Sequence, residues 1–257
     1  MDYKAAAAQL KENLRLRTEP FGVTFFKDAA ELPDKTRQPS KVFGKKVTIC
    51  QGVTLARVYG WPVGLTRDDL ICIPGMLVFG FTPATDPIME LGQLFCEVGF
   101  HSELGPALKE VEALPHFEPQ EIGAIYLCPL ERLTLDPEVV VVYGNPAQLM
   151  RLIQAATFSL GERVSGEFGG KVECSEYLIA PYRSGEFKVV IPGMGDRIFS
   201  MTQDDEMVVA FPGKFLAGLL MGLQEAGKKI GARYPITFYQ NFSPSFPPAY
   251  EERAKKW

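Results

Sequence analysis

The sequence predicts an α/β or α+β fold, with a mixed sheet flanked by helices and two halves that could be structurally related. Short apolar runs bounded by Gly and Pro are typical of buried strands. Longer segments that keep apolar residues on one face are typical of helices packed on a core. The two kinds of segment alternate loosely along the 257 residues, and a composition of 46% hydrophobic and 23% charged residues fits an ordinary globular protein.

The predicted helices have recognisable start and stop signals. Asn145 can cap the helix that follows it, Pro146 suits the first helical position, and Gly161 suits the end. Gly213 is expected to turn a strand into the last long helix, which ends at Gly231 after basic residues. The expected helices are 2–14, 86–100, 102–115, 145–161 and 214–231.

Five apolar runs are expected to form the strands, at 20–26, 122–128, 138–144, 187–193 and 206–213. Residues 27–46 are polar and contain prolines, which indicates a surface loop. Residues 233–257 are rich in aromatic residues and prolines, too apolar for a solvated tail. We expect them to form an arm that lies across its own domain or on a second subunit.

One pattern occurs twice in the chain. Thr-x-Asp-Asp followed by an apolar run and Pro-Gly spans residues 66–75 and again 202–213, and the tetrapeptide IPGM occurs at 73–76 and 191–194. The order agrees but the spacings differ, so both a duplication and chance remain open. With a duplication, a single domain of 1–257 would contain halves at 1–132 and 133–232. The aspartates suit turns and caps, which is the ordinary role of such pairs.

Charge and apolar patterning exclude several classes of protein. The net charge is −4, with 27 basic against 31 acidic residues, and no basic block marks a nucleic-acid or anionic-membrane partner. No apolar run approaches the roughly 18 to 20 residues of a membrane span, and the first residues do not resemble a signal peptide. We therefore expect a cytoplasmic protein. The two histidines, His101 and His116, have no nucleophile motif near them, so a catalytic triad is not predicted.

The five cysteines are the residues most suited to chemistry. An odd number in a reducing compartment indicates free thiols or ligands rather than disulfides. Cys96 and Cys128 fall within apolar patterns and are expected in the core. The other three stand at the edges of apolar segments beside turn-forming residues, where thiolates can meet a metal ion, an iron-sulfur cluster or a substrate: Cys50, Cys72 and Cys174.

The order of several segments resembles the ArCR family, a domain of unknown function. The most specific pieces are YGNPAQLMRL and DDEMVVAFPG, and the likeness covers nearly the whole chain. The resemblance implies cysteines at the places of Cys50 and Cys174 and one close to Cys72, although Ile73 here separates Cys72 from Pro-Gly. It also implies a single family domain and a cytoplasmic, often anaerobic setting. The family has no assigned activity.

Three functions from different classes therefore stand as hypotheses. In the first, Cys50, Cys72 and Cys174 hold an iron-sulfur cluster or another metallocofactor, with an electron partner. In the second, glycine-rich turns bind a small anionic ligand, phosphorylated or CoA-like. In the third, the chain is a noncatalytic subunit whose tail docks a partner; a homo-oligomer, most simply a homodimer, is expected in each case. The residues proposed for the anion site are Gly75, Gly193, Gly195 and Gly213, with Arg57, Arg183 and Arg197 as partners.

Overall fold

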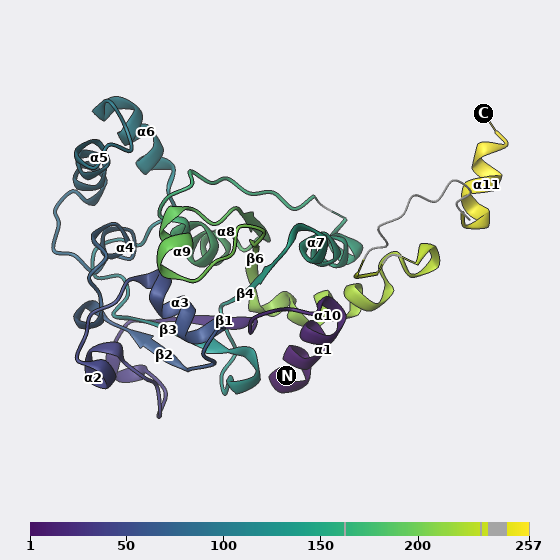
Figure 1. Cartoon of the computed structure of the whole chain (residues 1–257), viewed down its shortest axis with the longest axis horizontal. Helices are drawn as coiled ribbons and strands as arrows, with labels where there is room; N and C mark the ends of the chain where they lie inside the picture. Colours follow the sequence, from purple (N-terminus) through teal and green to yellow (C-terminus); the bar gives the residue numbers. More distant parts are fainter. Residues whose placement is uncertain (162, 232, 236–245, 257) are drawn as a thin grey trace.

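The computed structural model describes residues 1–161, 163–231, 233–235 and 246–256. A six-stranded sheet in the order β2-β3-β1-β4-β6-β5 forms the centre, with helices on both of its faces (Figure 1). The strands are β1 (Phe21–Phe26), β2 (Val63–Leu65), β3 (Ala124–Pro129), β4 (Val139–Gly144), β5 (Lys188–Val190) and β6 (Met207–Pro212).

The pairing of these strands defines the class of the fold. Each neighbouring pair of named strands is antiparallel. Parallel pairing within the described residues is limited to three isolated bridges, at Arg37–Val63, Val47–Leu70 and Ser165–Lys188. The α+β alternative of the predicted class is therefore confirmed.

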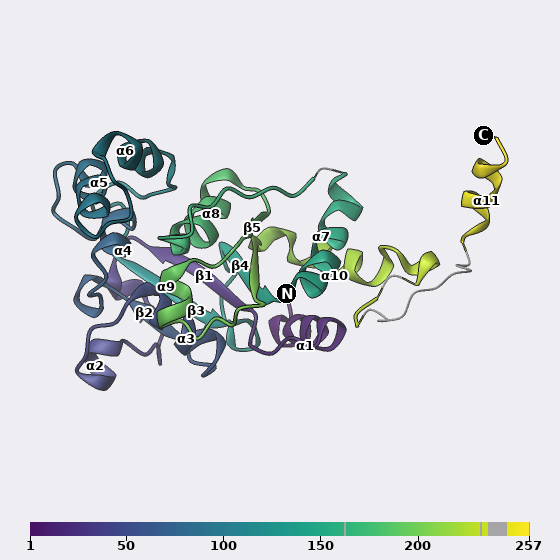
Figure 2. The same cartoon turned by 45° about the horizontal axis from the view of Figure 1, so that its top comes forward.

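Alternation along the strands separates two hydrophobic cores, because successive side chains of a strand point to opposite faces. In β4, Val139 and Val141 contribute to one core and Val140 and Val142 to the other. The second core is closed by α1 (Tyr3–Leu14), α7 (Pro146–Leu160) and α10 (Leu216–Glu225), which lie together in Figures 1 and 2. On the first face lie α3 (Ile49–Arg57), α4 (Ile73–Val78), α5 (Pro87–Glu97), α6 (Leu104–Ala113), α8 (Ala180–Ser184) and α9 (Met194–Phe199).

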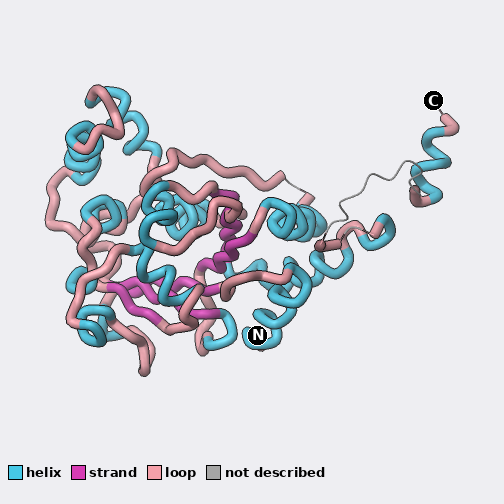
Figure 3. Tube along the Cα trace, in the orientation of Figure 1, coloured by secondary structure: helices cyan, strands magenta, loops and turns pink. Residues whose placement is uncertain are grey.

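Capping explains why the predicted helices form where they do. Asn145 accepts the Gln148 N–H at 3.0 Å, and Gly161 ends α7 with φ of 72°. Asp2 and Asp86 cap α1 and α5 in the same way. The expected end of the last long helix at Gly231 is wrong, because α10 ends at Glu225 and the chain turns left-handed at Gly227, with φ of 69°. Figure 3 shows how the helices and loops surround the strands.

Several α-helices lie where the sequence predicts none, and two of them lie between β1 and β2. The loop at 27–46 contains the short helix α2 (Pro39–Phe43). Residues 49–57 form α3, whose first turn has a capping box in which Thr48 accepts from Gln51 N–H and the Gln51 side chain accepts from Thr48 N–H. This second helix matters for the functional site, because it carries Cys50.

The strand order has the arrangement that two related halves would produce. β1 and β4 lie side by side at the centre, each is followed outward by the third strand of its own half, and the short second strand lies at each edge. The two IPGM segments occupy comparable places, because each follows an edge strand and begins or precedes a short helix, α4 or α9.

The repeated Thr-x-Asp-Asp segments do not share one role. Asp69 is buried, and its carboxylate accepts from Thr66 and Ser40. Asp205 is exposed and pairs with Arg17, whereas the acceptor that caps the second segment is Glu206, which receives the Gln203 N–H. Asp69 therefore caps a turn, as the sequence indicates, whereas Glu206 takes that role in the second segment.

Part of the expected C-terminal arm lies outside the described residues, namely 236–245. Before it, the Tyr234 hydroxyl accepts from the Asn145 side chain at 3.1 Å. After it, α11 (Pro248–Ala254) carries Tyr250, which stacks on Phe246 with 5.7 Å between ring centroids. These two rings are exposed, and Figure 1 shows α11 away from the sheet.

Two glycines of α10 provide a matched test of the packing between α7 and α10. A Cβ at Gly222 would lie 2.3 Å from the Ala155 carbonyl oxygen, whereas a Cβ at Gly218 meets no described atom within 4 Å. Gly222→Ala is expected to destabilise the protein by about 1–3 kcal/mol, because the backbones must move apart. Gly218→Ala is expected to stabilise it by about 0.5–1 kcal/mol through helix propensity. Urea unfolding of both variants checks the prediction, which fails if the two changes have the same sign.

Candidate metal centre

The structure brings the three predicted cysteines to one cavity. Cys50, Cys72 and Cys174 all line a pocket of about 210 Å³ on the face of the sheet that carries α3 and α4. Two of the predicted glycines, Gly75 and Gly195, line the same pocket. Residues from both halves of the chain therefore meet here.

Two of the thiols are placed by the beginnings of helices. Cys50 lies in the first turn of α3, between the two residues of the Thr48–Gln51 capping box that fix the start of the helix. Cys72 is the N-cap residue of α4, and Pro74 in the first turn of α4 sets the path of the chain. Cys50 is buried and Cys72 is half-buried, so the cavity can be reached from the side of Cys72.

The third thiol is placed by an unusual helix. Cys174 is fully covered and immediately precedes a π-helical turn at Ser175–Ile179, which continues into α8. A π-helical turn accommodates one extra residue and is frequent at functional sites. A left-handed glycine, Gly60, lies ten residues after Cys50, and Gly185 lies eleven residues after Cys174. The two cysteine-bearing helices thus have comparable positions before the edge strands, with one additional residue in the second.

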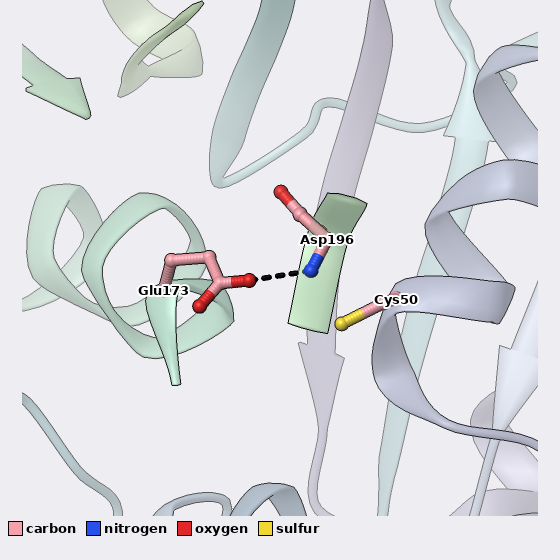
Figure 4. Close-up of side chains that lie close together, drawn as sticks. All are labelled: Cys50, Glu173 and Asp196. Atoms are coloured by element: carbon pink, nitrogen blue, oxygen red, sulfur yellow. Dashed lines mark hydrogen bonds between the residues drawn. The ribbon is translucent and has the colours of Figure 1, made fainter. Parts of the chain in front are cut away.

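Two carboxylates complete the site (Figure 4). The sulfur of Cys50 and one oxygen each of Glu173 and Asp196 lie within 4.8 Å of one another, and all three residues are buried. The Asp196 backbone N–H donates to Glu173 Oε1 at 2.6 Å. The other oxygen, Glu173 Oε2, is buried without a hydrogen-bond partner among the described residues. An ionised oxygen in that position is costly unless a cation or donor arrives.

Asp196 is oriented by two tyrosines. The hydroxyl of Tyr143 donates to Asp196 Oδ2 at 2.7 Å, and that of Tyr177 donates to Oδ1 at 3.0 Å. Both rings are buried, and Tyr177 belongs to the π-helical turn. Hydrogen bonds of this kind from the surroundings hold a ligating carboxylate in one orientation.

Behind Tyr143 lies a buried ion pair. The Arg57 guanidinium is 4.0 Å from the centre of the Tyr143 ring and donates to both carboxylate oxygens of Glu206 at 3.2 Å. Arg57 is only 1% exposed and also donates to the Thr202 hydroxyl. The pair supports the wall of the site, and Arg57 is therefore not available to a ligand in the cavity.

Without a bound cation, burial favours the protonated, neutral forms of the thiols and carboxyl groups at the site. Burial, and then the charge of Asp196, raises the pKa of the Cys50 thiol well above its usual value, and burial does the same for Cys174. Burial, with repulsion from Asp196, raises the pKa of Glu173 to about 7. Burial also raises the pKa of Asp196. Thiols and acids that resist ionisation in this way are poor nucleophiles but become ligands once a metal displaces their protons.

The four predicted glycines do not form one anion site. Gly195 approaches the ligand atoms closely, because a Cβ there would lie 3.2 Å from Glu173 Oε1 and 3.5 Å from the Cys50 sulfur. Gly193 packs against the Gly170 carbonyl and Glu173. Gly213 lies at the end of β6, where a Cβ would meet the Pro137 carbonyl at 2.0 Å, and its role is close packing.

The arginines expected to bind an anion are engaged elsewhere. Arg183 pairs with Glu121 at 2.5 Å, and Arg197 donates to the carbonyl oxygens of Pro192 and Gln203. The one cation that lines the cavity, among the described residues, is Lys171, which pairs with Glu110 at 2.7 Å. Buried carboxylates at the site oppose an anionic ligand, so the geometry favours a cation.

Sequence reasoning missed both acids, although each stands next to a feature that it identified. Glu173 precedes Cys174 directly, and Asp196 lies two positions after the end of the second IPGM. Cys96 and Cys128, the two cysteines that the sequence assigns to the core, do not line the site. Cys128 belongs to the core on the opposite face of the sheet.

None of the helices in the described ranges combines the length and the apolar character that crossing a membrane requires.

Comparison with known proteins identifies a family but no activity. A family model described as uncharacterised ArCR matches residues 9–221. An uncharacterized protein of Methanocaldococcus jannaschii is 25% identical over 219 residues, which is 85% of this chain and 92% of that protein. No solved structure matches the chain. The resemblance noted in the sequence is thus confirmed, and the chain belongs to the uncharacterised ArCR family.

Proposed function

We propose that the protein binds a thiophilic transition-metal ion or an iron-sulfur cluster in the cavity of Cys50, Cys72 and Cys174, with Glu173 as a further ligand. One observation carries the proposal: Glu173 lines the cavity together with three thiols, is 1% exposed, and has a buried oxygen, Oε2, without a partner among the described residues. A bound metal ion would supply the missing partner and balance the buried charge.

The donor set limits which metals suit the site. Thiolate sulfur favours zinc, copper(I) or iron-sulfur clusters over magnesium and calcium. The compact group of Cys50, Glu173 and Asp196 suits a single ion, since its ligand atoms lie within 4.8 Å of one another. Cys72 and Cys174 extend the set of thiols around the cavity, as a cluster requires. With three thiolate ligands, Glu173 would occupy the fourth position, which three thiolates alone would leave for a substrate or a redox partner.

A redox role in the cytoplasm, with the chain as a homodimer, is part of the same proposal. A buried thiolate centre near the surface suits one-electron exchange, because the surrounding apolar side chains control solvent access. Phe95 and Phe100 provide such side chains at the cavity.

Metal analysis of the full chain tests the proposal. Protein purified without oxygen is analysed for zinc, iron and sulfide, and metal-free protein is titrated with Co²⁺. We expect about one metal site per chain and a thiolate-to-cobalt charge-transfer band in the near ultraviolet. Absence of bound metal together with absence of that band in the titration would overturn the proposal.

The glycine beside the ligand atoms offers a more local test. Gly195→Ala would place a methyl group 3.5 Å from the Cys50 sulfur and 3.2 Å from Glu173 Oε1. Metal affinity is expected to fall about tenfold, or about 1.4 kcal/mol, because the ligand atoms must shift. Gly105→Ala is the matched control, since a Cβ there meets no described atom within 4 Å. Competitive titration with a chelator compares the two variants, and equal affinities would contradict the assignment of these ligand atoms.

A further inference from the structure

A second and larger cavity lies beside the thiol cavity. Its volume is about 510 Å³, within the roughly 300–1,000 Å³ range of small-molecule sites. Its walls come from the end of α6, the segment 165–169, the helix that contains Glu176 and Ala180, and β5. Gly169 lines this cavity and Lys171 lines the thiol cavity, so the segment 169–171 runs from one cavity to the other.

Glu176 is an acid of this cavity with a carboxylate oxygen that has no hydrogen-bond partner among the described residues. The residue is 4% exposed and belongs to the π-helical turn. Its Oε1 accepts the Gly169 N–H at 2.8 Å. Its Oε2 is buried and has no hydrogen-bond partner in the part of the chain that the structure describes. Because Glu176 also lines the cavity, a ligand that brings a donor would offset the cost of this unpartnered carboxylate oxygen.

Three of the four other charged residues around the cavity are paired, and the fourth, Glu167, is exposed. Glu110 contacts the His101 ring at 2.5 Å and Lys171 Nζ at 2.7 Å. Arg183 pairs with Glu121, and Lys188 pairs with Glu186 at 2.8 Å. Glu176 therefore decides which charge a ligand should carry, and that charge is positive.

Apolar side chains form much of the remaining wall. Leu114 and Val190 are buried, and Phe168 is 44% exposed. These surfaces suit the hydrocarbon part of a ligand, because burying apolar area is favourable while a few polar groups fix orientation.

We propose that this cavity binds a small organic amine, whose ammonium group donates to Glu176 Oε2 and whose hydrocarbon part packs against Leu114 and Val190. The proposal is independent of the metal centre, since Glu176 lines one cavity and the three thiols and Glu173 line the other. It also gives the π-helical turn a role toward both cavities, with Cys174 at its start facing one and Glu176 facing the other.

Binding of benzylamine and of the uncharged benzyl alcohol to the metal-free full chain tests this proposal. Isothermal titration and nuclear magnetic resonance shifts of the methyl groups of Leu114 and Val190 report affinity and location. Benzylamine is expected to bind at least about tenfold more tightly than benzyl alcohol. Glu176→Gln keeps the acceptor for Gly169 and is expected to weaken benzylamine at least about tenfold. Glu167→Gln, an exposed acid on the same cavity, is the matched control and is expected to change little.

Three results would overturn the proposal. The first is equal affinity for the amine and the alcohol, as expected if water alone satisfies Glu176. The second is unchanged benzylamine binding in Glu176→Gln with a melting temperature at or above that of the wild type. The third is a set of shifts confined to other methyl groups. Metal content is measured on the same samples, so that a failure of amine binding can be told apart from a failure of metal binding.

Discussion

Replacing Cys50 with serine is expected to weaken metal binding at least about a hundredfold, or about 2.7 kcal/mol, and to remove the thiolate-to-metal absorption. Cys50 belongs to the compact ligand group with Glu173 and Asp196, and it shares the cavity with the two other predicted thiols. Serine is close to cysteine in size and leaves the Thr48–Gln51 capping box in place, but it is a much weaker ligand for a thiophilic metal.

Cys96→Ser is the matched control for that variant. Cys96 is half-buried in α5 and lies outside the cavity, so its loss should leave metal affinity unchanged. Titration of both variants by competition with a chelator, under the same anaerobic conditions, gives the comparison. If Cys50→Ser and Cys96→Ser bind metal equally well, Cys50 is not a ligand.

Replacing Glu173 with glutamine is expected to stabilise the metal-free protein at pH 8 and to reduce the stabilisation that metal provides. Glutamine keeps an oxygen that can accept the Asp196 N–H, which Glu173 Oε1 accepts at 2.6 Å. It also removes the buried charge at Oε2, which has no described partner. A pKa raised from 4.5 to about 7 corresponds to at most about 3 kcal/mol of unfolding free energy.

The sign of the pH dependence follows from this pKa. Folded Glu173 holds its proton more tightly than the unfolded chain does, because its pKa is raised from 4.5 to about 7. The folded state therefore binds more protons between pH 4.5 and 7, and the free energy of unfolding of the metal-free wild type falls as the pH rises through that window. At pH 8 the folded wild type bears the whole free-energy cost of an ionised, buried Glu173. Below pH 4.5 that cost disappears because the residue is protonated in both states.

Chemical unfolding of wild type and Glu173→Gln at pH 4 to 8, with and without metal, measures both effects. The free energy of unfolding of the metal-free variant should increase relative to that of the wild type as the pH rises. When metal is added, the wild type should become the more stable of the two. Glu112→Gln, an exposed acid of α6, is the control for the loss of one formal charge. A metal-free variant that is no more stable than the wild type at pH 8 would contradict the account.

Local signals were sufficient to predict much of the fold. Asn145, Pro146 and Gly161 predict the limits of α7, because caps and left-handed ends act within a few residues. The antiparallel order of the strands depends on pairing between distant segments, and no local pattern reports it. The end of α10 was misplaced because Gly227 turns the chain four residues before Gly231.

The candidate site also contains residues that the sequence predicts and residues that only the folded chain reveals. The cysteines were predicted because thiols near turns are suited to ligation, and Cys50, Cys72 and Cys174 do line one cavity. Glu173 and Asp196 were not predicted, since acids are common and only the folded chain shows that both are buried. Gly213 and the three arginines were assigned to an anion site because they stand at or near predicted turns, without knowledge of the partners that engage them.

X-ray absorption at the edge of the bound metal tests the metal centre most directly. In the metal-loaded wild type we predict sulfur neighbours at about 2.3 Å together with an oxygen neighbour at about 2.0–2.2 Å, the lengths of thiolate and carboxylate bonds to zinc. The sulfur contribution should decrease in Cys50→Ser, and the oxygen contribution should decrease in Glu173→Gln. A spectrum with only oxygen or nitrogen neighbours, unchanged in both variants, would contradict the assignment of the cavity as a thiolate metal centre.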